Sequence, residues 1–278
     1  MTEARTIVGI DVGTTKICTL VGEVYEGDQL RIIGVGVAPS RGLRKGMVVN
    51  VHEATEAIQA SVRKAERVSG YEITSAFVGI GGGHIQSLNS RGVVGISRGA
   101  RGIGESDIER ALDAARAIAI PRNREIIHTI PRSYVVDGQE GVKDPIGMQG
   151  IRLEVEAHIV TGASTSVSNL VKCVRAAGVE IDDLILQSLA SGEAVLRDAE
   201  REMGVVLADV GGGTTDIGIF IEGSIWHTVV LGVGGEHLTR DVAVGLRTPF
   251  NTAEELKIRY GHAIPASLLT DERIEVTS

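Results

Sequence analysis

The sequence predicts an α/β fold built from two related halves, with a compact α+β module inserted into the first half. Short apolar runs typical of strands alternate along the chain with amphipathic stretches typical of helices. A unit made of an apolar strand, an aspartate, a glycine turn and two threonines occurs twice, at residues 5–15 and 204–215. Residues 84–161, which lie between the two copies, have a different pattern of apolar and polar residues and are interpreted as the inserted module.

The first half is expected to open with strands and continue into a helix. Asn50 is a good helix cap, and apolar residues then recur every three or four positions from Val51 to Val68. This spacing predicts a helix with one buried face that ends at Gly70. The strands expected here are residues 5–10, 17–21, 30–37 and 73–80, the first three forming an antiparallel meander.

The inserted module is expected to contain both strands and a helix. It shows alternating runs at 84–89 and 93–97, an alanine-rich helix at 105–119, and strands near 124–136 and 151–161. The chain then returns to the first half with a helix that stops at Gly178. The elements expected after it are a strand at 180–187, a short helix at 189–198, strands at 204–210, 217–221 and 225–231, and helices near 235–246 and 252–262.

Composition excludes several classes of protein. Hydrophobic residues make up 43% of the 278 residues and charged residues 23%, so a filled core is expected and disorder is not. The net charge of -8 disfavours nucleic acid as a partner and direct attachment to anionic lipid. No run approaches the roughly 20 apolar residues of a membrane span, and no signal-peptide core is present. Cys18 and Cys173 lie far apart, so two ordinary thiols in a reducing, cytoplasmic compartment are expected.

The two glycine turns have the chemistry of a nucleotide-phosphate site. Successive glycines present backbone N–H groups to an anion without side chains in the way, and neighbouring threonine hydroxyls add donors. Asp11 and Asp209, each at the end of a strand, are repelled by phosphate. Their expected role is therefore to hold Mg²⁺ through water. Lys16, directly after the first turn, would place an ammonium near the terminal phosphates.

Each turn taken alone is equally well explained as an ordinary β-hairpin turn, because Asp and Gly dominate such turns. Two copies with the same order of Asp, Gly and Thr favour a pair of loops that grip one ligand between the halves. Neither loop has the Gly-Lys-Ser/Thr end of a Walker A motif, and residues 79–83 do not open into the helix of a dinucleotide fingerprint. The histidines show no metal-ligand spacing, so Mg²⁺ is the one metal predicted.

Five segments together resemble the actin-like ATPases, and within them the FtsA family of bacterial division proteins. Residues 8–16 (VGIDVGTTK) and 207–220 (LADVGGGTTDIGIF) are similar to the two phosphate loops of that superfamily, and residues 182–196 (DDLILQSLASGEAVL) to its inter-domain helix. Residues 232–243 and 252–261 are similar to the elements that reach ribose and base. The likeness to FtsA depends on the insert. The amino-acid sequence of residues 83–96 (GHIQSLNSRGVVGI) and the position of the insert within the first domain both resemble that family.

The resemblance implies an actin-like (ribonuclease H-like) two-domain ATPase core with an inserted α+β subdomain. Residues 1–83 and 162–196 would form the first domain, residues 84–161 the inserted interaction subdomain, and residues 197–278 an incomplete second domain. The family's later adenosine loop, second inter-domain helix and C-terminal membrane-targeting helix have no counterpart before Ser278. We therefore expect this chain to be a fragment or a truncated form.

The resemblance also implies roles for individual residues. Asp183 is expected to orient the attacking water, with Gln187 as the alternative and a solvated turn as the competing explanation of Asp183. Glu254 and Lys257 would contact ribose and base, although an ordinary exposed ion pair explains them as well. The other implied residues are Gly13, Thr14, Thr15, Lys16, Gly211, Gly212, Gly213 and Thr214 at the phosphates, Gly234 and Gly235 at the sugar–phosphate edge, and Asp11 and Asp209 at Mg²⁺, with Asp209 also in the catalytic group.

The function implied by the resemblance is that of an ATP- and Mg²⁺-binding division protein. It would polymerise, tether the FtsZ ring to the inner face of the cytoplasmic membrane, and recruit later division proteins through the insert. Its membrane contact would need the C-terminal helix that this chain lacks, and its enzymatic activity would be at most slow ATP hydrolysis. Two alternatives stay open: a PilM-like assembly protein of type IV pili, and a sugar or acyl kinase of the same superfamily.

Overall fold

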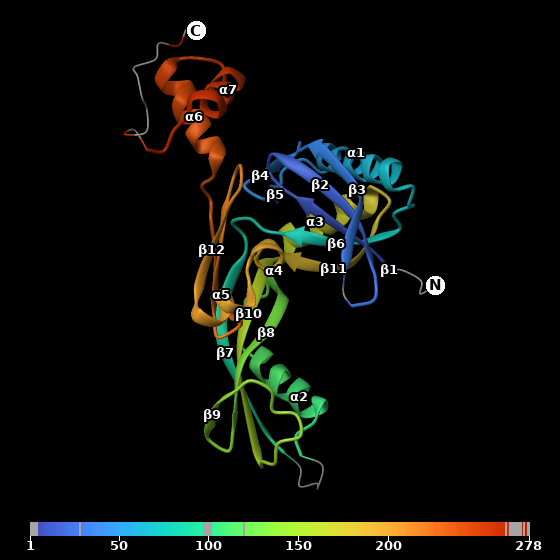
Figure 1. Cartoon of the computed structure of the whole chain (residues 1–278), viewed down its shortest axis with the longest axis vertical. Helices are drawn as coiled ribbons and strands as arrows, with labels where there is room; N and C mark the ends of the chain where they lie inside the picture. The colour runs from blue at the N-terminus through green and yellow to red at the C-terminus, as the bar shows by residue number, and fades with distance from the viewer. Residues whose placement is uncertain are drawn as a thin grey trace.

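The structure, a computed structural model, describes residues 5–27, 29–96, 102–118, 120–264, 266, 274 and 276. It has the predicted α/β architecture with an inserted α+β module (Figure 1). In Figure 1, the large sheet of the first half lies to the right of the smaller sheet of the second half. The inserted module extends below both of them, and two helices close to the C-terminal end lie above.

The first half is built on a five-stranded sheet with the order β11-β6-β1-β2-β3. The predicted meander is confirmed, because β1, β2 and β3 pair in antiparallel fashion. β6 runs parallel to β1, and β11 runs parallel to β6. The carboxyl ends of β1, β6 and β11 therefore meet at one edge, which is where α/β sheets bind ligands. The strands are β1 (Arg5–Val12), β2 (Lys16–Val24), β3 (Leu30–Pro39), β6 (Ser75–Ile80) and β11 (Glu180–Leu186).

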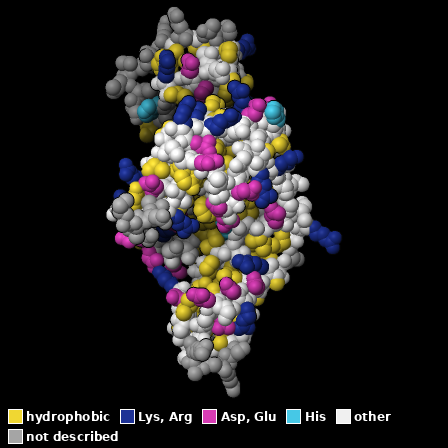
Figure 2. Space-filling model, turned by 90° about the vertical axis from the view of Figure 1, so that its right-hand side faces the viewer, with side chains coloured by type: hydrophobic (Ala, Val, Ile, Leu, Met, Phe, Trp, Pro, Cys, Tyr) yellow, Lys and Arg dark blue, Asp and Glu magenta, His cyan; other side chains and the backbone are white. Residues whose placement is uncertain are grey.

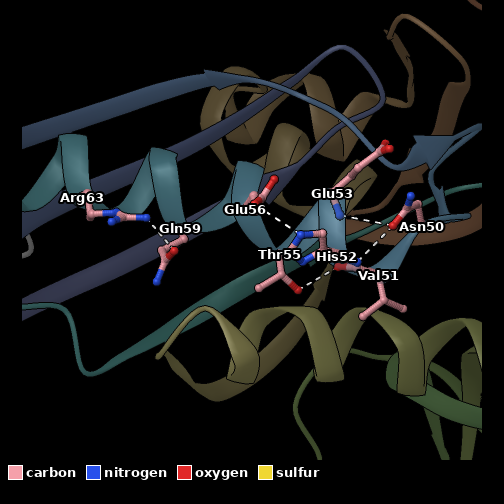
Figure 3. A network of polar contacts seen from close by, with 8 residues as sticks. All are labelled: Asn50, Val51, His52, Glu53, Thr55, Glu56, Gln59 and Arg63. Atoms are coloured by element: carbon pink, nitrogen blue, oxygen red, sulfur yellow. Dashed lines mark hydrogen bonds and ion pairs between the residues drawn. The ribbon is translucent and has the colours of Figure 1, made fainter.

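Two helices, α1 (Val51–Ser69) and α3 (Ser164–Ala176), pack on one face of this sheet. The Asn50 side chain caps α1 as predicted, because its Oδ1 accepts the backbone N–H groups of His52 and Glu53 (Figure 3). Gly70 ends the helix with a φ of 71°, in the left-handed region. The close approach of α1 to β3 needs Gly36, since a Cβ there would lie 2.0 Å from the Ser61 carbonyl oxygen.

The inserted module has its own sheet, with the order β7-β10-β8-β9, and its own apolar core. The two alternating runs expected at 84–89 and 93–97 belong to one strand over the part of them that is extended, residues 86–95, and residue 97 lies outside the described residues. The ten residues of this strand pair with β10 without a break, so the polar residues in its middle keep their backbone partners. The boundaries at 84 and 161 stay a prediction. The elements are β7 (Gln86–Gly95), α2 (Glu105–Arg116), β8 (Arg124–Val136), β9 (Gln139–Val142) and β10 (Arg152–Ala163).

Two helices, rather than the single one expected at 189–198, lead from β11 into the second half. Leu196 adopts an extended conformation and separates α4 (Gln187–Val195) from α5 (Asp198–Met203). A three-stranded antiparallel sheet follows, and then a pair of helices. These elements are β12 (Val205–Val210), β13 (Thr215–Ile221), β14 (Ser224–Leu231), α6 (Gly235–Leu246) and α7 (Phe250–Tyr260).

β14 also contacts the inserted module, so the module touches both halves of the molecule. The buried His158 of β10 connects Asn89 Oδ1, 2.7 Å from its Nδ1, to Thr228 Oγ1, 3.0 Å from its Nε2. Burial, with further effects from His227 and Arg132, lowers the pKa of His158 to about 4. The Arg132 guanidinium lies 3.7 Å from the centre of the Trp226 ring.

Charged side chains of both signs are spread over the face shown in Figure 2, with hydrophobic side chains between them. Over the part of the chain that the structure describes, no helix combines the length and the apolar character needed to cross a membrane.

Candidate functional site

The two glycine turns are closed by the same type of hydrogen bond. In the first loop, residues 13–16, the N–H of Gly13 donates to the carbonyl of Lys16 at 3.1 Å and closes the β1–β2 hairpin. In the second loop, residues 211–214, the N–H of Gly211 donates to the carbonyl of Thr214 at 2.9 Å and closes the β12–β13 hairpin. The repeat seen in the sequence is therefore a repeat of one local structure.

These two loops face each other across the boundary between the halves. A Cβ at Gly212 would lie 2.2 Å from Thr15 Cγ2, and one at Gly213 would lie 2.8 Å from Thr14 Oγ1. A side chain at either glycine would therefore force the facing threonine to move. A cavity of about 280 Å³ lies between the loops and is lined by Asp11, Gly13, Thr14, Thr15, Lys16, Gln187, Asp209, Val210, Gly211, Gly212, Thr214 and Asp216.

Helix α4 positions the two aspartates at the mouth of this cavity. Gln187 Nε2 donates to Asp11 Oδ1 at 2.7 Å, and Ser191 Oγ donates to Asp209 Oδ2 at 2.7 Å. The two donors are four residues apart and so lie on one face of the helix. Burial, with the charge of Asp209, raises the pKa of Asp11, although the hydrogen bond from Gln187 opposes the shift.

A third carboxylate, Asp216, completes the acidic group and was missed by the sequence analysis. It lies opposite Asp209 in the β12–β13 pair, its residue is 4% exposed, and its Oδ1 is buried with no hydrogen-bond partner. Burial raises the pKa of Asp216 to about 6, and the charges of Asp209 and Asp11 add to this shift. A hydrogen bond with Thr214 acts in the opposite direction and lowers the pKa. The hairpin register could have found it, because a four-residue turn places the residue seven positions after Asp209 directly across the ladder.

Asp183 and Gln187, the two candidates for orienting water, lie in different places. Asp183 is exposed in β11, where its Oδ1 accepts the N–H of Leu184 at 2.8 Å. It does not line the cavity, whereas Gln187 does. The two residues differ because Gln187 is the first residue of α4, and the packing of this helix directs its side chain toward Asp11 at the end of β1.

Gly234 and Gly235 lie against the second loop, at the start of α6. The N–H of Gly235 donates to the Gly211 carbonyl at 2.9 Å, and the N–H of Gly234 donates to His237 Nδ1 at 3.1 Å. A Cβ at Gly234 would lie 2.5 Å from the Gly211 carbonyl oxygen. Both amides thus have acceptors within the chain, and α6 is held rigidly to the loop.

Glu254 and Lys257 form an ion pair beside the same helix start. Lys257 Nζ lies 2.7 Å from Glu254 Oε2, and it also donates to Thr239 Oγ1 at 2.8 Å and to the Gly235 carbonyl at 3.3 Å. Thr239 also bonds to Glu254. The hydrogen bonds from Lys257 and Thr239 lower the pKa of Glu254. The pair joins α6 to α7 and is thus more than a solvent-exposed contact.

The acidic residues suit a hydrated cation. Three carboxylates share a narrow space, and one of their oxygens is buried without a partner. Within the described ranges, no three acidic, histidine or cysteine side chains converge closely enough to hold a metal ion directly. A cation here would keep much of its water shell, as Mg²⁺ prefers to do.

Two family models match the chain. The model described as the SHS2 domain inserted in FtsA matches residues 82–161, and the model described as cell division protein FtsA matches residues 206–278. The cell division protein FtsA of Pseudomonas aeruginosa is 50% identical over 274 residues, and that of Borreliella burgdorferi is 49% identical over 262. The alignments cover 99% and 94% of this chain but 65% and 63% of the relatives, so the chain spans about two thirds of their length or slightly less.

Solved structures show the same fold at low sequence identity. A chain of a structure described as the PilM–PilN type IV pilus biogenesis complex superposes with a TM-score of 0.68 at 16% identity, covering 92% of this chain and 70% of that one. MreB5 of Spiroplasma citri bound to AMPPNP gives a TM-score of 0.50 at 15% identity, covering 98% of this chain and 66% of that one. These likenesses establish the actin-like fold.

Proposed function

The chain belongs to the FtsA family of cell division proteins, and from this premise we propose that it binds ATP with Mg²⁺ in the cavity between its two glycine loops. The observation that carries the proposal is the meeting of two equivalent hairpins across one cavity, with carboxylates from both. MreB5, which has the same fold, is described as bound to AMPPNP, and this supports the proposal.

The backbone N–H groups of the glycine loops and the hydroxyls of Thr14, Thr15 and Thr214 would hold the β- and γ-phosphates, with Lys16 adding positive charge. Asp11, Asp209 and Asp216 would hold Mg²⁺ through water. The bound ion would neutralise phosphate charge. The orphaned Oδ1 of Asp216 fits this role, because a buried carboxylate oxygen needs a cation or a donor.

Gln187 is our proposed water-orienting residue, in place of Asp183. Its amide already bonds to Asp11 at the mouth of the cavity, so it can hold a water beside the terminal phosphate while Asp11 fixes its orientation. A neutral amide orients water without removing its proton, so Gln187 supplies no general base. We therefore propose a nucleotide-dependent switch with weak ATPase activity.

The cellular role that we propose is that of the family. The protein would lie at the inner face of the cytoplasmic membrane at the division site, polymerise, link the FtsZ ring to the membrane, and recruit later division proteins through the inserted module. The PilM likeness supports a shared fold, and a PilM-like role in pilus assembly stays as the alternative.

Calorimetric titration with ATP tests the binding proposal. The wild-type chain should bind ATP with Mg²⁺ and lose about tenfold or more of its affinity in EDTA or on Asp209→Ala. Asp182→Asn, an exposed carboxylate change in β11, is the matched control and should bind within twofold of wild type. A folded wild-type chain that binds no ATP would overturn the proposal.

Two further measurements separate the finer parts of the proposal. Gln187→Ala should lower any ATP hydrolysis rate without weakening ATP binding, and Asp183→Ala should leave both unchanged. The opposite result would return the role to Asp183. Purified chain should co-sediment with FtsZ and not bind a pilus-machinery peptide, whereas the reverse would favour the PilM-like alternative.

A further inference from the structure

A short hairpin reaches the two glycine loops from a third direction. β4 (Leu43–Arg44) and β5 (Met47–Val48) pair around the two-residue turn Lys45–Gly46. Both turn residues have positive φ, 51° for Lys45 and 72° for Gly46, as a type I′ turn requires. The first position of this turn strongly favours Asn, Asp or Gly, and lysine is an uncommon residue for it. The lysine is therefore placed at some conformational cost.

The tip of this hairpin contacts both loops. The N–H of Gly46 donates to Thr14 Oγ1 of the first loop at 3.1 Å. A Cβ at Gly213 of the second loop would lie 3.2 Å from Lys45 Cα. The carbonyl of Lys45 accepts the N–H of Gly83 at 3.4 Å, which ties the tip to the segment after β6. The turn is thus held where the two halves meet.

The Lys45 side chain crosses from the first half to the second. A Cβ at Gly232, in the segment between β14 and α6, would lie 3.6 Å from Lys45 Nζ and 3.7 Å from its Cδ. Lys45 is half-buried, and its ammonium forms no ion pair with any residue that the structure describes. The nearby cavity is lined by three carboxylates and one ammonium, so its net charge is negative; these groups are Asp11, Asp209, Asp216 and Lys16. A half-buried ammonium without a counter-ion suits an anionic ligand.

We propose that Lys45 is a phosphate-binding residue, which places its ammonium on the terminal phosphate of a nucleoside triphosphate held between the glycine loops. The inference rests on the proposed function, and it adds the β4–β5 hairpin to the two glycine loops as a third element of that site. The turn fixes the backbone of the residue, so the four-carbon stem needs only rotamer changes to move its charge from Gly232 to the phosphate. The same contact connects the two halves when a triphosphate is bound.

The test uses three variants of the full chain, with ATP and ADP as ligands in the presence of Mg²⁺. Lys45→Met removes the charge and keeps the stem, and it should weaken ATP binding about 10- to 100-fold but ADP binding less than threefold. Lys45→Gly removes the charge and relieves the positive φ, so its Tm should equal or exceed that of wild type while ATP binding falls as in Lys45→Met. Arg44→Met, an exposed change on the same hairpin, is the control and should bind ATP within twofold of wild type.

The outcomes separate this inference from the proposed function. ATP binding by Lys45→Met and Lys45→Gly within twofold of wild type overturns the phosphate contact and leaves the nucleotide site intact. Equal losses for ATP and ADP, accompanied by a lower Tm in both variants, would mean that Lys45 only packs against Gly232. If folded wild-type chain binds no ATP, the proposed function fails and this inference fails with it.

Discussion

Replacing Asp216 by asparagine should stabilise the nucleotide-free protein at neutral pH. Asp216 is 4% exposed as a residue, its carboxyl group lies near Asp11 and Asp209, and one oxygen of that group has no partner. Burial and these two neighbours raise its pKa from 3.8 to about 6. The native state therefore favours the neutral form more than the unfolded chain does, and asparagine is neutral at every pH while preserving the shape of the side chain.

The raised pKa determines the sign and the size of the effect. Below pH 3.8 the group is neutral in both the native and the unfolded state. As the pH rises toward 6 the unfolded chain ionises first, so the native state loses relative stability, and above pH 6 the loss is complete. A shift of about two pKa units at 1.36 kcal/mol each gives a maximum loss of about 3 kcal/mol. Asp216→Asn should recover up to this amount at pH 8 and about half of it at pH 5.

Urea denaturation at pH 8 and pH 5, without nucleotide or Mg²⁺, measures both values. Asp182→Asn is the control, because it removes an exposed carboxylate and should change the free energy of unfolding by less than about 0.5 kcal/mol. If Asp216→Asn is no more stable than wild type at pH 8, or if its advantage is the same at both pH values, Asp216 does not carry a buried charge in the cavity. The same variant should lose the Mg²⁺-dependent part of ATP affinity, so stability and binding change in opposite directions.

The remaining predictions concern the contact between the inserted module and β14, and helix α6. Burial lowers the pKa of His158 from 6.5 to about 4. Below about pH 6.5 the unfolded chain therefore binds a proton at this residue that the native state does not. The free energy of unfolding should fall by up to about 3 kcal/mol between pH 6.5 and 4. Urea denaturation at pH 7 and pH 5 should show a smaller loss in His158→Gln than in wild type, and an equal loss would contradict the assignment. Gly234→Ala should destabilise by about 1–3 kcal/mol, because its Cβ would lie 2.5 Å from the Gly211 carbonyl oxygen. Gly245→Ala, in the same helix with no atom within 4 Å of its Cβ, should instead be neutral or stabilising in thermal melts.

Local structure was predicted well because it depends on neighbouring residues. The Asn50 cap and Gly70 stop of α1 are interactions within four residues of the chain, and the structure has both. The two glycine loops are closed by hydrogen bonds between residues three apart, so their likeness was visible as a repeated motif. The differences from the structure concern single residues inside regular patterns. Leu196 breaks the expected helix at 189–198, and the polar middle of β7 is kept in the strand by its pairing with β10.

The amino-acid sequence by itself determined the fold class, the two glycine loops and the aspartate at the end of each preceding strand. The tertiary structure alone decided which distant side chains join them: Gln187 rather than Asp183 contacts Asp11 across 176 positions of the chain, and the Lys45 turn contacts Gly213 of the opposite half. The physical reason is that periodicity and turn preference act over a few residues. Contact across a cleft depends on how α4, the β4–β5 hairpin and two sheets pack against one another, and spacing along the chain does not encode that packing.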